Sequence, residues 1–221
     1  FEIDVQETGD ALESLLTLPD GSVVSCVALD HNGIPSLGYK FRSPDKLKFL
    51  HEQLAHLGLD SGAWISQLQQ SVKHGILNDH LIIEGRSFAI RDLSSKLLQS
   101  ESGEALVYLT DLSFDRRNVK RIQDAFNASS RMICESSFLD KDRPRAVAKA
   151  HLTTRHAALL ATVLGVNDLQ IFHVSTIYGQ GAEESLAEAR QFFDEFSGLD
   201  GHDQERALEA EFKAVESLRN Q

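Results

Sequence analysis

Five residues spread along the sequence have side chains that could bind a metal ion or move a proton. They are His31, Asp111, Glu135, His151 and His173. Imidazole nitrogens and carboxylate oxygens are the usual ligands of zinc and related divalent ions. A histidine beside such an ion can also donate a proton to a leaving oxygen. These residue types predict metal-assisted hydrolysis if the fold brings them together.

Each of these residues also has an ordinary structural interpretation. A single histidine at the end of a strand is commonly a polar surface residue, and Asp111 could cap the segment that follows it. Glu135 and His151 would suit exposed positions equally well. Residue type alone therefore leaves the metal site and the structural interpretation open.

The elements that would position these residues alternate between strands and helices. The pattern predicts strands at residues 22–29, 36–41, 81–83, 88–90, 105–109, 131–134 and 169–172, and helices at residues 45–57, 63–74, 118–126, 153–164, 182–196 and 204–218. This alternation predicts an α/β fold. His31, Asp111 and Glu135 follow predicted strands, and His173 ends one, which is where α/β sheets collect reactive groups.

Composition restricts the class of protein. The 221 residues carry 33 acidic and 22 basic side chains, a formal charge of −11, which argues against a protein that coats nucleic acid by bulk charge. No apolar run reaches the roughly 18 residues of a membrane span, and no secretion signal opens the sequence. Cys26 and Cys134 form no paired metal motif, so we expect a reducing, cytoplasmic location. The sequence lacks an initiator methionine, and we expect it to be a processed or truncated product.

Charge is unevenly distributed along the chain. Residues 183–216 hold eleven acidic side chains against three basic ones, which predicts a solvated helical face. Two local basic clusters occur, one of Arg116, Arg117, Lys120, Arg121 and Arg131 and one of Lys141, Arg143, Arg145, Lys149 and Arg155. Taken alone, each cluster is most simply a solubilising surface.

Five segments, in order, resemble motifs of ribonuclease Z, the metallo-β-lactamase-fold endonuclease that trims tRNA 3′ ends. His31 followed by Gly38-Tyr39-Lys40 resembles a ligand histidine followed by a GYR-like strand. The segment YLTDLS, which contains Asp111, resembles a GDT-like turn, and CESSF, which contains Glu135, resembles HEATF. The segment AHLT, which contains His151, resembles GHST, and FHVSTIY, which contains His173, resembles THFSPRY. The matches span residues 27–178, about two-thirds of the chain.

The resemblance implies a site that holds two metal ions, usually zinc. It makes His31 and His173 ligands and Asp111 the bridge between the ions. It makes His151 the residue that helps the leaving 3′ oxygen depart, Glu135 the carboxylate that polarises His151, and Thr153 a phosphate contact at a helix N-terminus. It also implies a tRNA precursor as partner and a homodimer.

The departures from the family pattern affect the substrate more than the metal. Leu112 replaces the hydroxyl residue of the GDT turn, Cys134 replaces the histidine of HEATF, and Ile177 replaces an expected arginine. The HxHxDH motif, which would supply most of the ligands and the base that activates water, does not occur in the sequence. A protruding arm that grips tRNA is not evident either.

These observations predict a fold and leave three functions open. We expect residues 1–221 to be the C-terminal part of a single metallo-β-lactamase-like domain, an αββα sandwich that lacks its N-terminal portion. Half of such a sandwich leaves an apolar sheet face for another segment or chain to cover. The favoured function is a metal-dependent phosphodiesterase acting on tRNA 3′ trailers. The alternatives are a non-catalytic half-domain that acts as scaffold or regulator and a hydrolase of another ester.

Overall fold

The computed structural model describes residues 12–127, 129–179 and 182–220, which form two compact units. The second unit is Pro44–Gly103, and the first comprises the described residues on either side of it. The sequence patterns do not predict this division. The assignment of residues 1–221 to a single domain stays a prediction.

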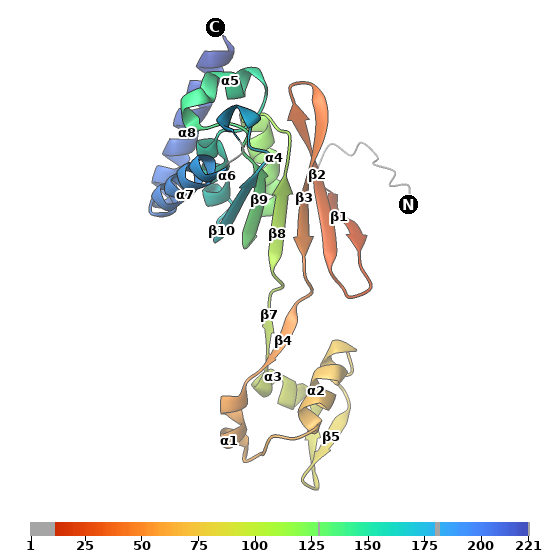
Figure 1. The fold of residues 1–221 in the computed structure, drawn as a ribbon. Coiled ribbons are helices and arrows are strands. Elements are labelled where there is room, and N and C mark those ends of the chain that lie inside the picture. Colours follow the sequence, from red (N-terminus) through yellow and green to blue (C-terminus); the bar gives the residue numbers. More distant parts are fainter. Residues whose placement is uncertain (1–11, 128, 180–181, 221) are drawn as a thin grey trace. The chain divides into compact units, whose positions relative to one another are not determined.

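A six-stranded mixed sheet forms the centre of the first unit (Figure 1). Its strands in spatial order are β1 (Leu12–Thr17), β2 (Val23–His31), β3 (Ile34–Arg42), β8 (Ala105–Leu109), β9 (Arg131–Glu135) and β10 (Asp168–Phe172). The pairs from β1 to β8 are antiparallel, and β8, β9 and β10 are parallel. Because β2 and β8 both run antiparallel to β3, the carboxyl ends of β2, β8, β9 and β10 lie at one edge of the sheet.

Helices pack against one face of this sheet. They are α4 (Arg116–Phe126), α5 (Arg143–Ala148), α6 (Thr154–Val163), α7 (Glu183–Ser197) and α8 (Gly201–Arg219), with short 3₁₀ turns at Asp140–Asp142 and Thr176–Tyr178. Helix α6 packs on β9 and β10, and α7 and α8 pack on α6. Side chains all around α6 are therefore buried, which explains its predominance of Ala and Leu.

The two faces of the sheet differ in exposure. Alternate residues on the helix-covered face are buried, namely Val27, Leu29, Val107, Leu109, Met132 and Cys134. Gly38 belongs to this face because a Cβ there would lie 2.8 Å from Leu109 Cδ2. On the opposite face Tyr39, Tyr108, Ile133 and Phe172 are only half-buried, and Phe41 is 45% exposed. This second face is apolar but incompletely covered.

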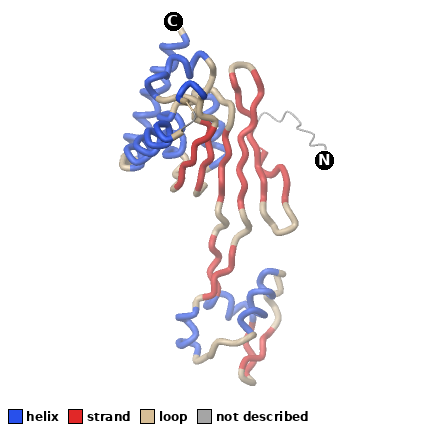
Figure 2. Tube along the Cα trace, viewed as in Figure 1, coloured by secondary structure: helices blue, strands red, loops and turns tan. Residues whose placement is uncertain are grey.

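The second unit has its own small core. Strand β4 (Lys46–Phe49) pairs with β7 (Leu98–Glu101), and β5 (His80–Ile83) forms a hairpin with β6 (Arg86–Ala89). Its helices are α1 (Leu54–Leu57), preceded by a 3₁₀ turn at His51–Gln53, α2 (Trp64–Lys73) and α3 (Ile90–Leu97). Their buried side chains include Trp64, Leu68, Ile90 and Leu97. Figure 2 shows the helices of both units in blue and the strands in red.

The predicted α/β class is confirmed, and most predicted elements occur within a few residues of their expected bounds. The helix predicted at residues 45–57 is wrong in its first half, because residues 46–49 form β4 and pair with β7 about fifty residues later. Its second half is helical, as a 3₁₀ turn at residues 51–53 followed by α1. The predictions omit β1, α3, β7 and α5. None of the described helices combines the length and the apolar character that crossing a membrane requires.

Candidate metal centre

The carboxyl edge of the six-stranded sheet gathers the residues selected from the sequence. His31 ends β2, Asp111 follows β8, Glu135 ends β9 and His173 follows β10. His151 lies between α5 and α6, and its ring centroid is 4.8 Å from that of His31 and 5.1 Å from that of His173. Residues up to 142 positions apart in the sequence thus form one cluster because their strands end at the same edge.

Three of these residues are close enough to hold one ion. Asp111, His151 and His173 each offer a ligand atom, and these atoms lie within 4.8 Å of one another. Asp111 Oδ1 is shielded from solvent, lies 3.2 Å from His173 Nδ1 and has no hydrogen-bond partner. A shielded carboxylate oxygen without a partner fits a cation site, because leaving such an atom unpaired is unfavourable. The sequence motifs predict only proton transfer for His151, so the structure adds this residue to the potential ligands.

Hydrogen bonds fix the orientation of two of the imidazoles. His31 Nδ1 donates to the carbonyl oxygen of Ala150 at 2.9 Å, and His151 Nδ1 donates to Glu135 Oε1 at 3.1 Å. Metal-binding histidines commonly donate one ring N–H to a carbonyl or a carboxylate in this way. In both rings Nε2 is the nitrogen that remains available to a metal or a substrate.

Glu135 is the buried carboxylate behind this arrangement. Its side chain is fully buried, and it accepts hydrogen bonds from the Leu112 amide at 3.3 Å and from the Ser137 hydroxyl at 3.0 Å as well as from His151. The hydrogen bond to Glu135 raises the pKa of His151, while partial burial and the charge of Lys149 oppose that rise. Glu135 therefore holds the ring in place and favours its protonated form.

The backbone is strained at the cluster. Asp111, Ala150 and His173 have φ angles of 48°, 61° and 59°, in the left-handed region that favours glycine. Such conformations persist only where the surrounding structure imposes them, and they concentrate at functional sites. Among the described residues, the other non-glycine residues with positive φ are Asn32 and Glu84, both in tight turns between paired strands.

The loops after β9 and β10 are joined to each other beside the cluster. The Ser136 amide donates to the Phe172 carbonyl, and the Ser175 amide donates to the Ser137 carbonyl. Farther along, the Tyr178 hydroxyl donates to Asp142 at 2.6 Å and accepts from the Leu139 amide at 3.0 Å. These bonds fix the loop that carries His173 against the loop that follows Glu135.

Thr153 serves as the cap of α6. Its hydroxyl is buried and accepts from the His156 amide at 3.2 Å, while its own amide donates to His156 Nδ1 at 3.3 Å. The Thr154 amide is also occupied, by the Phe138 carbonyl. The predicted phosphate contact of Thr153 stays a prediction, and this geometry gives it no support because the hydroxyl and these two amides already have partners.

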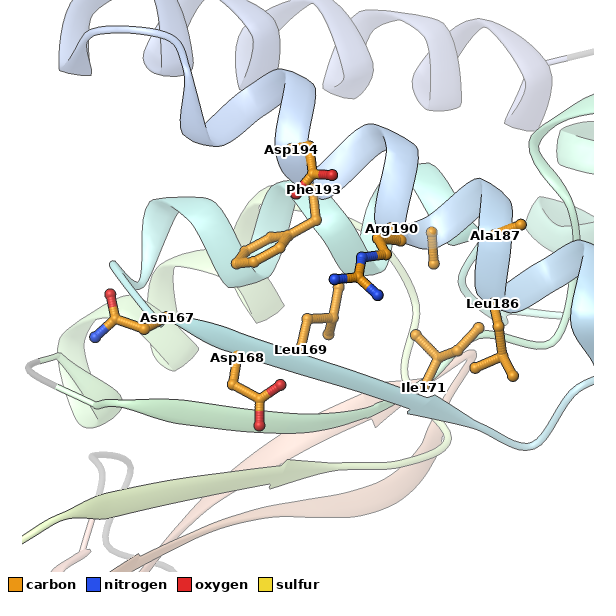
Figure 3. A pocket seen from close by; sticks show the side chains of 10 residues that line it. Asn167, Asp168, Leu169, Ile171, Leu186, Ala187, Arg190, Phe193 and Asp194 are labelled. Atoms are coloured by element: carbon orange, nitrogen blue, oxygen red, sulfur yellow. The ribbon is translucent and has the colours of Figure 1, made fainter.

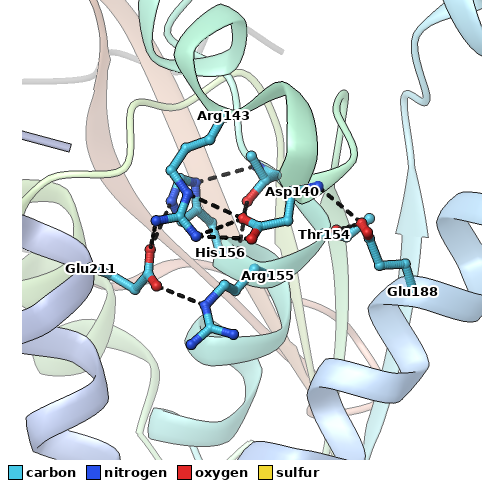
Figure 4. A network of polar contacts seen from close by, with 8 residues as sticks. Asp140, Arg143, Thr154, Arg155, His156, Glu188 and Glu211 are labelled. Carbon is cyan, nitrogen blue, oxygen red and sulfur yellow. Dashed lines mark hydrogen bonds and ion pairs between the residues drawn. The ribbon is translucent and has the colours of Figure 1, made fainter. Parts of the chain in front are cut away.

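A charged network anchors α6 to α8 and to the turn before α5 (Figure 4). Glu211 lies 2.7 Å from Arg155 Nε and 3.1 Å from Arg143 Nη1, and Arg143 also binds Asp140 at 2.8 Å. Glu211 is buried, so the prediction that the acidic residues 183–216 form a solvated face is wrong at this position. Burial raises the pKa of Glu211, but His156, Arg155 and Arg143 together lower it to about 2.

A groove between β10 and α7 lies in the same unit (Figure 3). Leu169, Ile171 and Phe193 form apolar parts of its wall, and Arg190 and Asp194 contribute charge. None of the five site residues lines this groove. The groove is thus a feature separate from the metal-ligating cluster.

The sequence is similar to several bacterial proteins named ribonuclease Z. It is 28% identical over 168 residues to that of Deinococcus radiodurans, an alignment that covers 76% of this chain and 49% of the relative. Identity is 30% with the Bradyrhizobium diazoefficiens protein (78% and 52% covered) and 31% with the Thermosynechococcus vestitus protein (79% and 41% covered). No family model matches the sequence. The chain spans about half the length of the curated relatives it matches.

Two solved structures also resemble this chain. Human tRNase Z, short form, gives a TM-score of 0.40 at 17% identity and covers 75% of this chain and 40% of its own. The metallo-β-lactamase fold protein YhfI from Bacillus subtilis gives a TM-score of 0.43 at 13% identity, with 87% and 48% covered. The resemblance to ribonuclease Z predicted from the motifs is confirmed by the sequence relatives.

Proposed function

We propose that this chain supplies one half of the active site of a metal-dependent phosphodiesterase that removes 3′ trailers from tRNA precursors. The observation that carries the proposal is the convergence of two metal ligands, Asp111 and His173, with the proton donor His151; one side-chain atom of each lies within 4.8 Å of the others at one sheet edge. Similarity to proteins named ribonuclease Z supports the choice of substrate.

Each residue has a role in this proposal. Asp111, His173 and His31 would hold the metal, with Asp111 as the bridge between two zinc ions. When bound, such ions polarise the phosphate and lower the pKa of a water molecule. His151, protonated with the help of buried Glu135, donates its proton to the departing 3′ oxygen.

The same proposal includes the wider setting of the chain. Residues 1–221 form the C-terminal part of a metallo-β-lactamase-like domain, with Pro44–Gly103 as a compact insertion. The partners are a tRNA precursor, a second copy in a homodimer and the polypeptide that supplies the remaining ligands. The compartment is the cytoplasm.

The test uses the full-length natural polypeptide in which this sequence occurs. We expect it to cleave a 3′-extended tRNA precursor in the presence of zinc and to lose this activity with EDTA or on His173→Ala substitution. Glu135→Gln should lower kcat more than it raises KM, because Glu135 acts through His151. Cleavage no greater than that of His173→Ala would overturn the proposal.

Two other outcomes would identify the alternatives. Protein that purifies without metal and cleaves nothing would indicate a scaffold or a regulator. Leu112 and Ile177 stand where the family has polar residues, and they favour a different ester as substrate. Hydrolysis of a carboxylic ester without cleavage of a phosphodiester would establish that second function.

A further inference from the structure

The second basic cluster of the sequence divides into two groups in the structure. Lys141 pairs with Glu184 at 3.0 Å, and Arg143 and Arg155 pair with Glu211. For Arg145 and Lys149, no carboxylate lies within ion-pair distance among the residues that the structure describes. Both side chains are exposed. Two positive charges of the cluster thus remain available to a ligand.

These two cations lie beside the candidate metal centre. Arg145 Cζ lies 5.9 Å from the centre of the Phe138 ring, and that ring lies 6.4 Å from the ring of His151. Lys149 caps the C-terminus of α5 and lies two residues before His151 in the chain. The Ala150 carbonyl between them binds His31. The two cations therefore belong to the same segment as His151 and as the Ala150 carbonyl that binds His31.

The two charges are close to each other in the chain. Arg145 lies in the last turn of α5 and Lys149 caps its C-terminus four positions later, a spacing at which like charges repel. The two carboxylates of the preceding 3₁₀ turn already have partners, Asp140 with Arg143 and Asp142 with the Tyr178 hydroxyl. An external anion would neutralise the pair, and contact with Phe138 already restricts the Arg145 guanidinium.

We propose that Arg145 and Lys149, together called the cationic rim, bind backbone phosphates of the nucleic-acid strand next to the bond that is cleaved. This inference rests on the proposed function and extends it by naming where the strand lies relative to the metal centre. Arginine and lysine contacts to phosphates position a nucleic acid without reading its sequence. The rim therefore fixes the path of the strand past His151 and leaves base selection to other residues.

The experiment measures binding and not cleavage. Fluorescence anisotropy of the full-length natural polypeptide with labelled 3′-extended tRNA, in EDTA and over a range of salt concentrations, gives the affinity and its salt dependence. We expect the Arg145→Gln/Lys149→Gln double variant to bind several-fold more weakly. The slope of log K against log salt should become shallower by about 0.7 for each lost contact with a single strand.

A matched control removes the same charges elsewhere. Arg190 and Lys213 are exposed on α7 and α8, so Arg190→Gln/Lys213→Gln has the same net charge as the rim variant. We expect its affinity and salt slope to equal those of the unsubstituted protein. Equal effects in the two double variants would show a general charge effect and overturn the rim proposal.

Two further arms separate this inference from the proposed function. Single-stranded DNA of the same length should show the same loss of affinity, because the contact is with the backbone. Loss of binding to a polyglutamate peptide without loss of binding to RNA would instead assign the rim to an acidic protein and overturn the proposal. Cleavage of a small phosphodiester by the unsubstituted protein with zinc tests the proposed function without involving the rim. If the small phosphodiester is not cleaved but the rim variant binds nucleic acid more weakly, the proposed reaction is wrong and the rim proposal stands.

Discussion

At the scale of single residues, the candidate site combines free ligand atoms with firmly held neighbours. Asp111 Oδ1 has no hydrogen-bond partner, whereas the Nδ1 atoms of His31 and His151 each have one. Ligand atoms that are oriented before an ion arrives lose less conformational freedom when it binds. The hydrogen bonds at Nδ1 thus orient the rings of His31 and His151 within the cluster.

Metal binding should therefore raise thermal stability. With zinc at about 100 times its Kd, linkage predicts about 2.7 kcal/mol of stabilisation, or a Tm increase of about 5–10 °C for a domain of this size. Differential scanning calorimetry with and without chelator measures this shift. His173→Ala should reduce it, and an unchanged shift in that variant would place the zinc elsewhere.

The Glu211 network should make stability depend on acid pH. The pKa of Glu211 is lowered to about 2 from an ordinary 4.5, so its stabilising effect is complete above pH 4.5 and is lost as the pH falls towards 2. The shift corresponds to about 3 kcal/mol. Urea unfolding should give a lower free energy of unfolding at pH 3 than at pH 7. Glu211→Gln should remove most of the part of this decrease that Glu211 contributes.

A control for this prediction lies on the same helix. Glu209 pairs with Arg116 but is exposed, and screened surface pairs contribute little. Glu209→Gln should leave the pH dependence of unfolding nearly unchanged. An equal effect of the two substitutions would mean that burial of Glu211 has no energetic consequence.

At the scale of elements, the local sequence predicts those helices and strands whose formation depends on neighbouring residues in the chain. Residues 105–109 read as a buried strand and form β8 with those bounds, because each side chain there is apolar or aromatic. Residues 45–57 read as a helix that begins after a proline, yet residues 46–49 pair with β7, far along the chain, and the helical part begins only at residue 51. The site residues were predicted from motifs, but their convergence depends on strand order. The cationic rim could not be predicted, because Glu184 and Glu211 neutralise its neighbours from more than forty positions away.

The insertion should be dispensable for folding of the first unit. Arg42 pairs with Ala105, and the Ser43 amide donates to the Glu104 carbonyl at 2.9 Å, so the two ends of the insertion lie close together. Replacing residues 46–101 with a short Gly-Ser linker should preserve the far-UV spectrum expected of the first unit and the zinc-induced Tm shift. Failure of the shortened chain to unfold cooperatively would contradict this.

At the scale of the whole molecule, the sheet face that the described residues cover only in part has the largest consequence. Tyr39, Tyr108, Ile133 and Phe172 are apolar or aromatic and half-buried, and Phe41 is 45% exposed. Contiguous apolar surface of this kind marks an interface or a liability to aggregate. We therefore expect another segment or chain to cover it, as half of a sandwich requires.

The 221-residue chain alone should accordingly self-associate and bind a hydrophobic dye. Phe41→Ser should reduce the sedimentation coefficient and the dye fluorescence. Ile177→Ser, which removes a side chain of equal 45% exposure outside the sheet, should not. A monomer that binds no dye would show that the face needs no partner.

Asp111 and His173, whose backbone lies in the left-handed region, limit how far the protein can be stabilised by design. At most positions a glycine variant of a protein is less stable than the alanine variant. At Asp111 and His173, where the φ angles are 48° and 59°, the glycine variant should be the more stable one. Asp111→Gly and His173→Gly should each be more stable than the matching alanine variant by about 1 kcal/mol, as thermal unfolding would show. Glycine has no ligand atom, so a screen for heat resistance alone would select the loss of these side chains. A variant that combines heat resistance with the metal-ligating side chains therefore needs stabilising substitutions at other positions in the chain.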